Sequence, residues 1–502
     1  MNRQISRVAL FALLLLASLI VVTTYWQTWA SGSLAAREDN AVQRVAQFQI
    51  KRGLIFASDG KTLLAANTAK KIAGQTLYFR RYPRYQFASQ TVGYSTQSRS
   101  RAGLEEGMNT YLTGSETDLA GLVDSVGDRL TGSTITGDNL ILTLHAKEQT
   151  LAESLLRGKC GAAVVLNPNT GAVLAMASSP SYDQNLMEQP NGYAKVQSTP
   201  SPCPPESASP LLNRATQGLY PPGSTFKTIT AAAALDNGVY TPSSTFYDPG
   251  YCTEYGKPVY NALDQNGPEA YGTVNLVEAY QHSINAVFCK IGITLGAQRI
   301  LDEAKQFGFY STPPLETPND ERAPSGCYVG THLFDPKNAD TAVDPGRLAF
   351  GQACMLATPL QMALVASAIA DKGKIMRPTL IKRIVSPSGT TLGKLKPRVW
   401  KVATKPSTAA AIKAMMVEVV QAGTGTEAQI PGVEVAGKTG TAETCTGCTV
   451  YDAWFIFFAP ANDPTVAGAV VVEHSPNGFG GAVAAPIARD LMQAILPGTR
   501  KG

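Results

Sequence analysis

An uncharged apolar segment at the N-terminus is the feature that most restricts how this chain can fold. No charged residue occurs between Arg7 and Arg37, and the run Val8–Trp29 is almost wholly apolar. Because about 20 helical residues cross the roughly 30 Å hydrocarbon layer of a membrane, this run predicts one transmembrane helix over residues 8–29. Arg3 and Arg7 precede it, so the positive-inside rule predicts that residues 1–7 stay in the cytoplasm and that the rest lies outside.

A cleaved signal peptide is the alternative interpretation of this segment, with Val8–Val22 as its apolar region. The tripeptide Thr28-Trp29-Ala30 matches the small-x-small pattern of a cleavage site poorly. Tyr25, Trp26 and Trp29 stand where the aromatic belt of a membrane surface would lie, and a signal peptide has no use for such a belt. The segment is therefore expected to remain as an anchor.

The length and composition of the chain describe a globular protein of more than one folded unit. A chain of 502 residues with 44% hydrophobic and 16% charged residues is neither disordered nor fibrous. Short alternating runs broken by Gly, Ser and Thr predict a strand-rich pedestal over residues 30–138, followed by an α/β unit over residues 139–502. A net charge of +5 suits a surface beside anionic lipid or wall polymer, and nucleic acid is not indicated.

Five apolar runs in residues 139–502 predict a single five-stranded sheet, with helices on its faces. The first two runs form a hairpin around the turn Pro168-Asn169-Thr170-Gly171. The predicted strands are Gly161–Leu166, Ala172–Met176, Glu434–Lys438, Trp454–Ala459 and Val466–Val472. The helices expected to cover them are Gly223–Asn237, Pro359–Asp371 and Ala485–Ile495. The unit is therefore expected to be of the α/β (α+β) class.

Eight cysteines are too few for a disulfide scaffold, although outside the membrane they are free to pair. Cys445 and Cys448 form a lone C-x-x-C, for which a local disulfide or two free thiols is expected, because zinc needs about four ligands. Cys289 and Cys354 lie in apolar helical patterns and are interpreted as buried small hydrophobic residues. The other four lie outside such patterns and are open to bridges that the sequence does not assign: Cys160, Cys203, Cys252 and Cys327. We predict no metal site and no cofactor.

The first candidate for chemistry is Ser224, which follows the turn Tyr220-Pro221-Pro222-Gly223 at the start of a helical run. The N-terminus of a helix carries unpaired N–H groups and partial positive charge, which stabilise an oxyanion forming beside the serine. Lys227 lies three residues on, close enough to accept the serine proton if its amine is neutral. A helix-capping serine with a solvated lysine is the structural alternative.

The second candidate is Ser283-Ile284-Asn285, inside the apolar helical pattern Leu276–Ile291. A serine hydroxyl there can relay a proton to a leaving amine while the asparagine amide holds a substrate carbonyl. Helix capping by Ser283 is the alternative. A Ser–His pair with His282 is disfavoured, because adjacent residues on a helix do not face each other.

The third candidate is Lys438-Thr439-Gly440-Thr441, expected at the end of a strand. Gly440 allows close approach of another backbone, the two threonine hydroxyls suit a carboxylate, and the N–H of Thr441 suits an oxyanion. The alternative is an edge-strand lysine with threonines on a pleated surface. The order S-x-x-K, S-x-N, K-T-G turns three weak signals into one strong prediction of serine acyltransfer.

With these motifs the chain resembles the penicilloyl-serine transferases, and more narrowly the class B penicillin-binding proteins. Further shared segments are Arg52-Gly53-Leu54-Ile55, Gly103-Leu104-Glu105, Leu166–Met176, Pro180-Ser181-Tyr182-Asp183, Gly351-Gln352 and Thr358–Ala363. The resemblance implies the penicillin-binding transpeptidase fold, with an antiparallel sheet. It also implies that Ser224 is acylated, that Lys227 is its base, that Ser283 relays a proton and that Asn285 orients the substrate. Lys438, Thr439 and Thr441, around Gly440, are implied to bind the terminal carboxylate and the oxyanion.

The function that follows is D,D-transpeptidation of peptidoglycan stem peptides outside the cell membrane, with covalent inhibition by β-lactams. The implied partners are the stem peptide or its lipid-linked precursor polymer, the membrane, and a glycan polymerase of the SEDS family. The stretch before residue 139 is too short for a glycosyltransferase domain, which argues against a bifunctional protein. A D,D-carboxypeptidase and a non-catalytic β-lactam sensor or scaffold are the alternatives.

Overall fold

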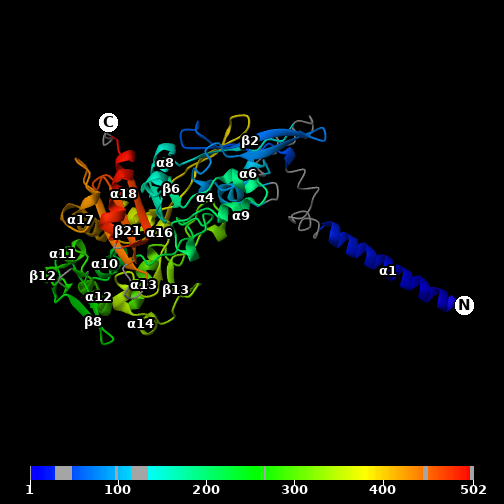
Figure 1. Ribbon diagram of the computed structural model, residues 1–502. Helices are drawn as coiled ribbons and strands as arrows, with labels where there is room; N and C mark the ends of the chain where they lie inside the picture. The colour runs from blue at the N-terminus through cyan, green and yellow to red at the C-terminus, as the bar shows by residue number, and fades with distance from the viewer. Residues whose placement is uncertain are drawn as a thin grey trace.

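The computed structural model describes residues 2–28, 48–96, 100–115, 134–261, 263–264, 267–444, 450–476 and 478–497. The N-terminal run forms helix α1, Asn2–Thr28, of which the stretch Gln4–Tyr25 is apolar and not buried against the rest of the protein. In Figure 1 it extends away from the folded region. This helix is long and apolar enough to cross a membrane, as the sequence predicts.

The predicted five-stranded sheet is present, and every neighbouring pair of strands is antiparallel. In spatial order its strands are β20 (Ala436–Glu443), β21 (Val450–Ala459), β22 (Val466–Pro476), β5 (Gly161–Leu166) and β6 (Val173–Ser179). The predicted end of β20 is wrong, because the strand continues past Lys438 through the whole K-T-G motif. Thr439, Gly440 and Thr441 pair with Phe455, Trp454 and Ala453 of the neighbouring strand, and these backbone bonds prolong β20.

Both faces of this sheet are buried, which explains why its strands are almost continuously apolar. Helix α16 (Pro359–Ala370) is buried along its whole length and contacts β5, β21 and β22 on one face. Helices α8 (Ala146–Leu155) and α18 (Gly480–Ile495) cover the other face, as Figure 1 shows. Alternate residues of β21 divide between the two cores: Trp454 and Ile456 pack with the first, Phe455 and Phe457 with the second.

A second, six-stranded sheet forms the pedestal end of the folded region. In spatial order its strands are β18 (Thr391–Lys394), β17 (Ile381–Val385), β4 (Asn139–Leu142), β1 (Ile55–Phe56), β2 (Leu63–Ile72) and β3 (Gln75–Arg81). Strands β1 and β4 run parallel, and the other pairs are antiparallel. Strands that precede β5 in the chain therefore pair here with β17 and β18, which lie in the sequence between the central strands β6 and β20. Hydrophobic patterns along the chain do not reveal this pairing.

The pedestal segments shared with class B proteins meet in one buried ion cluster. Glu105 is fully buried, and its carboxylate accepts hydrogen bonds from Arg52 at 2.9 Å and from Arg80 at 2.5 Å. Burial alone would raise the pKa of Glu105, but the two guanidinium groups hold that pKa below its ordinary value. The cluster ties the first residues of the pedestal to β3 and to the short helix α5 (Gly103–Gly107).

Three disulfides join six cysteines: Cys160–Cys203, Cys252–Cys289 and Cys327–Cys354. The interpretation of Cys289 and Cys354 as unpaired hydrophobic residues is therefore wrong. Cys289 does lie on a buried helix, but that helix packs on the strand that carries Cys252. Cys354 lies in a turn, since the following helix begins only at Pro359. Cys445 and Cys448 lie outside the described residues.

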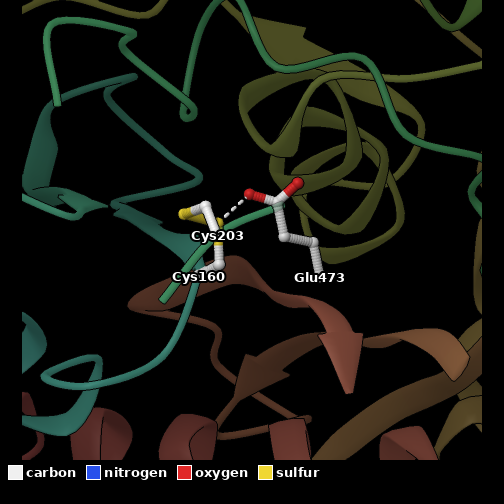
Figure 2. Close-up of side chains that lie close together, drawn as sticks. All are labelled: Cys160, Cys203 and Glu473. Carbon is white, nitrogen blue, oxygen red and sulfur yellow. Dashed lines mark hydrogen bonds between the residues drawn. A yellow bond between two sulfur atoms is a disulfide. The ribbon is translucent and has the colours of Figure 1, made fainter. Parts of the chain in front are cut away.

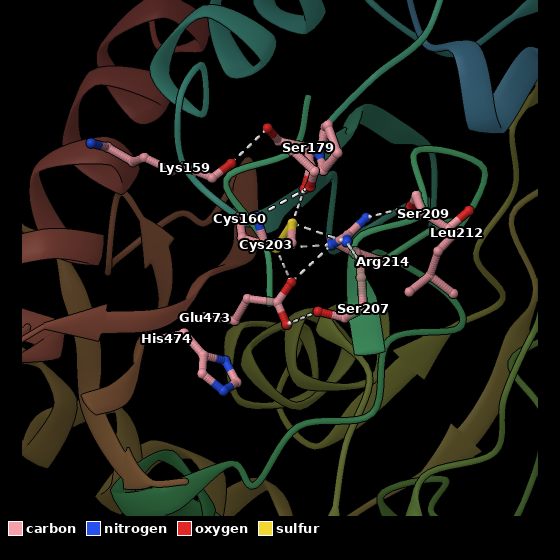
Figure 3. Close-up of a disulfide and its surroundings, with 12 residues drawn as sticks. Lys159, Cys160, Ser179, Cys203, Ser207, Ser209, Leu212, Arg214, Glu473 and His474 are labelled. Atoms are coloured by element: carbon pink, nitrogen blue, oxygen red, sulfur yellow. Dashed lines mark hydrogen bonds and ion pairs between the residues drawn. A yellow bond between two sulfur atoms is a disulfide. The ribbon is translucent and has the colours of Figure 1, made fainter. Parts of the chain in front are cut away.

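A buried ion pair stands beside the disulfide Cys160–Cys203. Figure 2 shows the carboxylate of Glu473 beside the two sulfur atoms, and Figure 3 adds the guanidinium of Arg214. The Nε atom of Arg214 lies 2.9 Å from Oε1 of Glu473, and both side chains are almost fully buried. Nε also lies 3.3 Å from the Cys160 sulfur. Two sulfurs bonded to each other and faced by a guanidinium are poor metal ligands, so this group is structural.

Replacing Glu473 with alanine is expected to lower the free energy of unfolding by about 3–5 kcal/mol, because it leaves the Arg214 charge buried without a partner. The matched control is Glu427→Ala, which removes an exposed carboxylate 4.0 Å from Arg489 and is expected to cost less than about 1 kcal/mol. Denaturant unfolding of the full chain in detergent measures both. Equal losses in the two variants would contradict this account.

Candidate active site

Ser224 lies in a tight turn that leads directly into a buried helix. The 3₁₀ turn Gly223–Phe226 is followed by helix α10, Lys227–Asp236, so the first turn of the predicted helix is 3₁₀. Gly223 has φ 52°, and its N–H donates to the carbonyl oxygen of Gly351 at 3.1 Å. A left-handed residue at this close approach requires glycine. Ser224 is half-buried, whereas Lys227 is completely buried one turn later.

The sequence pattern predicts that Ser283 lies inside one helix, but it lies at the turn between two helices. Helix α11 (Leu276–Gln281) ends before it, and helix α12 (Asn285–Leu295) begins after Ile284. Ser283 has φ 58°, a left-handed conformation that costs a non-glycine residue roughly 1–2 kcal/mol. Its side chain caps neither helix, so the capping alternative is excluded. His282 packs against the ring of Tyr271 instead of pairing with this serine.

The amine of Lys227 is held by the second motif. Its Nζ donates to the carbonyl oxygen of Ser283 at 2.7 Å and to Oδ1 of Asn285 at 2.7 Å. Nζ also lies 3.2 Å from Oγ of Ser283 and 5.2 Å from the ring centre of Phe288. The S-x-x-K and S-x-N motifs, 56 residues apart in sequence, therefore share one set of contacts.

Lys438 of the third motif approaches the same serine from the sheet. Its Nζ donates to Oγ of Ser283 at 2.9 Å and to the carbonyl oxygen of Thr439 at 3.1 Å. The amine also lies 5.5 Å from the ring centre of Tyr280. The hydroxyl of Ser283 thus bridges two buried lysine side chains, Lys227 and Lys438.

Burial lowers the pKa of both lysines. Burial, with a smaller contribution from Lys438, holds the pKa of Lys227 well below its ordinary value. Burial lowers the pKa of Lys438 to about 7. A neutral amine has two N–H donors and one lone pair, so the carbonyls of Ser283 and Asn285 occupy the donors of Lys227. Its lone pair is then left to accept a proton from a hydroxyl.

The K-T-G residues stand on β20, at the edge of the five-stranded sheet nearest Ser224. A Cβ atom on Gly440 would lie 2.9 Å from the carbonyl oxygen of Pro222, so the predicted close backbone approach is present. Within the part of the chain that the structure describes, β20 pairs with β21 alone, so it forms an edge of the sheet. The edge and the serine turn together form one wall of the site.

The two threonines occupy different surroundings. Thr439 is almost fully buried, and its Oγ1 lies 2.6 Å from Oγ1 of Thr424. Thr441 is half-buried, and its Oγ1 accepts from the N–H of Gly480 at 3.2 Å. Thr424 follows helix α17 (Pro406–Ala422) and was not predicted, because no local pattern distinguishes it from other loop threonines. Of the two predicted hydroxyls, that of Thr441 is the more accessible.

Two family models match this chain, one in the pedestal and one in the α/β unit. Residues 161–493 match the family model of the penicillin binding protein transpeptidase domain, and residues 52–140 match that of the penicillin binding protein A dimerisation domain. The peptidoglycan D,D-transpeptidase PbpA of Mycolicibacterium smegmatis is 34% identical over 99% of both chains. Its namesake in Mycobacterium tuberculosis is also 34% identical, over 99% of this chain and 100% of the relative.

Solved structures agree with the sequence relatives. A ceftriaxone acyl-enzyme of penicillin-binding protein A from M. tuberculosis aligns with a TM-score of 0.79 and 32% identity, over 90% of this chain and 100% of that one. A D,D-transpeptidase domain from Eggerthella lenta aligns with a TM-score of 0.73 and 31% identity, over 89% and 98% of the two chains. The chain is therefore similar over nearly its whole length to mycobacterial penicillin-binding protein A. The chain belongs to the class B penicillin-binding protein transpeptidases.

Proposed function

We propose that Ser224 is the nucleophile with which this peptidoglycan D,D-transpeptidase forms its acyl-enzyme, and that Lys227 is the base that activates it. The observation that carries the proposal is the Ser283 hydroxyl held between the amines of Lys227 and Lys438. Lys227 itself lies one helical turn after Ser224. A buried neutral amine close to a hydroxyl is what nucleophilic serine catalysis needs when the site contains no histidine base.

In the proposed reaction Oγ of Ser224 attacks the carbonyl carbon between the two terminal D-alanines while its proton passes to Lys227. The C–N bond then breaks, and the leaving amine takes a proton from Ser283, which Lys227 replaces. An acceptor amine on a second stem peptide attacks the acyl-enzyme by the reverse proton route, so the serine is restored. In a β-lactam the broken amide lies in a ring, and the leaving amine stays attached.

The roles proposed for the third motif follow from charge and backbone geometry. Lys438 supplies positive charge to Ser283 and toward the terminal carboxylate of the substrate, which the Thr441 hydroxyl also contacts. Thr439 holds the strand through Thr424, and the N–H of Thr441 contributes to the oxyanion hole. Gly440 lets the serine turn approach, and Asn285 orients the substrate while it holds the base.

A D,D-carboxypeptidase would use the same groups and differ only in its acceptor, water. A donor peptide ending in D-Ala-D-Ala, supplied with and without an acceptor amine, separates the two activities. Amide product in the presence of the amine supports transfer, and exclusive hydrolysis supports the carboxypeptidase. A sensor or scaffold would form the acyl-enzyme with β-lactams but would not turn over the donor peptide, with or without the acceptor amine.

The proposed placement is a single-pass membrane protein with residues 1–7 in the cytoplasm, an anchor over 8–29, a pedestal over 30–138 and the transpeptidase domain over 139–502. The two arginines before the anchor support this orientation. The two matched family models describe dimerisation and transpeptidation, so the glycan strands would be made by another protein. A SEDS-family polymerase in the same membrane fits that requirement.

Mapping the penicillin adduct tests the nucleophile directly. Trypsin cleaves after Arg214 and Lys227, so one peptide, residues 215–227, carries Ser224. We expect the mass of penicillin on this peptide, and fragmentation is expected to place it on Ser224 and not on Thr216 or Thr225. An adduct on any other peptide would overturn the assignment.

A further inference from the structure

A small hairpin next to the catalytic motifs presents tyrosine rings to solvent. Strand β8 (Tyr251–Glu254) pairs with β9 (Lys257–Tyr260). Exposed and buried residues alternate along β8, whereas in β9 only Val259 is buried. Tyr251 is 44% exposed and Tyr260 is 47% exposed. The two are direct cross-strand partners, with ring centres 6.4 Å apart.

The residues that share the outer face with the tyrosine pair are uncharged, whereas the exposed Lys257 is the cross-strand partner of Glu254 on the opposite face. Beside the tyrosine pair, Thr253 is the cross-strand partner of Pro258, and both are exposed. Glu254, the acidic residue of β8, is buried on the opposite face, where its carboxylate accepts from the N–H of Gly346. Exposed tyrosines with neutral neighbours offer apolar ring surface and hydroxyl groups together. We refer to Tyr251, Thr253, Pro258 and Tyr260 as the tyrosine face.

The tyrosine face is fixed to the element that carries the S-x-N motif. Nδ2 of Asn285 donates to the carbonyl oxygen of Tyr260 at 3.1 Å, while Oδ1 of the same side chain accepts from the base Lys227. The N–H of Ala286 donates to Oδ1 of Asn261 at 2.9 Å, and the disulfide Cys252–Cys289 joins β8 to α12. The rings are therefore exposed on a backbone that is held rigidly against the active site.

We propose that the tyrosine face binds the glycan strand of the peptidoglycan substrate, with the rings of Tyr251 and Tyr260 stacked on pyranose rings. The inference rests on the proposed function, since it places the sugars that bear the reacting stem peptide. Pyranose rings combine C–H faces with hydroxyl groups, which match the body and the tip of a tyrosine. The stem peptide carries charged carboxylates and amines, for which the neutral tyrosine face offers no partner.

The position of the hairpin agrees with this occupant. In Figure 1, β8 lies at the end of the folded region far from the pedestal strand β2. A strand lying on β8 and β9 there would present its stem peptide to the neighbouring Asn285 and Lys227. Exposed aromatic residues gathered beside a catalytic centre are typical of a binding surface.

The test compares substrates with and without sugar. The double variant Tyr251→Ala/Tyr260→Ala keeps the backbone carbonyl that Asn285 binds, and Tyr193→Ala, at a 60% exposed tyrosine of helix α9 (Gly192–Gln197), is the matched control. For the double variant, kcat/KM on a polymeric glycan bearing pentapeptides is expected to fall at least tenfold relative to kcat/KM on a sugar-free pentapeptide donor. The control is expected to leave that ratio as in the wild type.

A binding measurement separates the remaining explanations. Peptide-free glycan chains, prepared by amidase digestion of wall polymer, are expected to bind the full-length chain in detergent and to bind the double variant at least tenfold more weakly. An equal loss of kcat/KM on both donors would assign the tyrosine face to the peptide and overturn the proposal. If the double variant lost association between copies of the chain but kept glycan binding, the tyrosine face would bind a second copy, and this result would also overturn the proposal. Penicillin labelling of Ser224 in the same samples tests the proposed function independently.

Discussion

Replacing Ser224 with alanine is expected to abolish covalent labelling by a fluorescent penicillin and to reduce transpeptidation by about 10⁶-fold, the loss typical of a missing serine nucleophile. In the proposed mechanism the substitution removes the oxygen that forms the acyl bond, and it leaves the turn at Gly223, the side chain of Lys227 and the bridging Ser283 in place. Gel fluorescence after incubation with the labelled β-lactam measures the first effect, and a donor–acceptor peptide assay measures the second.

The matched control is Ser243→Ala, at an exposed serine of the loop after helix α10. Its labelling is expected to equal that of the wild type, and both variants are expected to unfold at the wild-type temperature, because neither serine is fully buried. Labelling of Ser224→Ala at the wild-type level would show that another hydroxyl forms the acyl bond.

Replacing Lys227 with arginine is expected to reduce the acylation rate by about 10²–10⁴-fold, the range for loss of a general base. Arginine stays protonated, so it has no lone pair for the serine proton. Lys227→Ala is expected to lose a similar amount. The second-order rate constant of penicillin acylation measures both, and a rate for the arginine variant within tenfold of the wild type would contradict a base at this position.

The same assignment predicts how acylation of the wild type depends on pH. Lys227 acts in its neutral form, so the rate is expected to rise with pH through the lowered pKa of this lysine. Lys438 acts in its charged form, and because its pKa is about 7 it loses its proton above about pH 7. Together these two ionisations give a bell-shaped dependence of the acylation rate on pH, in which the rate begins to fall near pH 7. A rate constant that stays level between pH 5 and 9 would refute these roles.

Burial of the charged form of both lysines is unfavourable for folding, as is expected at the catalytic site that we propose. The pKa of each lysine is lower in the folded chain than in the unfolded chain. At a pH between these two pKa values the unfolded chain therefore binds more protons than the folded chain. Stability therefore rises with pH across that window, for Lys438 from about 7 toward its ordinary value of 10.5. The left-handed backbone of Ser283 adds strain at the same place.

The sequence by itself determined the features that depend on near neighbours along the chain. The apolar run before Arg37 predicted a helix long and apolar enough to cross a membrane, because length and lack of charge are properties of the local sequence. Runs such as Gly161–Leu166 predicted the strands of the central sheet, since a strand buried on both faces must be apolar throughout. Ser224 and Lys227 were placed together by the spacing of one helical turn.

Only the tertiary structure decided the contacts between segments distant in sequence. It placed Ser283 at a left-handed turn between two helices, between lysines 56 and 155 residues away. It paired Cys289 with Cys252 and brought β17 and β18 into the pedestal sheet. The local pattern around each of these residues also fits a plain helix or strand. Which partner each one meets is fixed by how the helices and sheets pack, and periodicity along the chain carries no record of that packing.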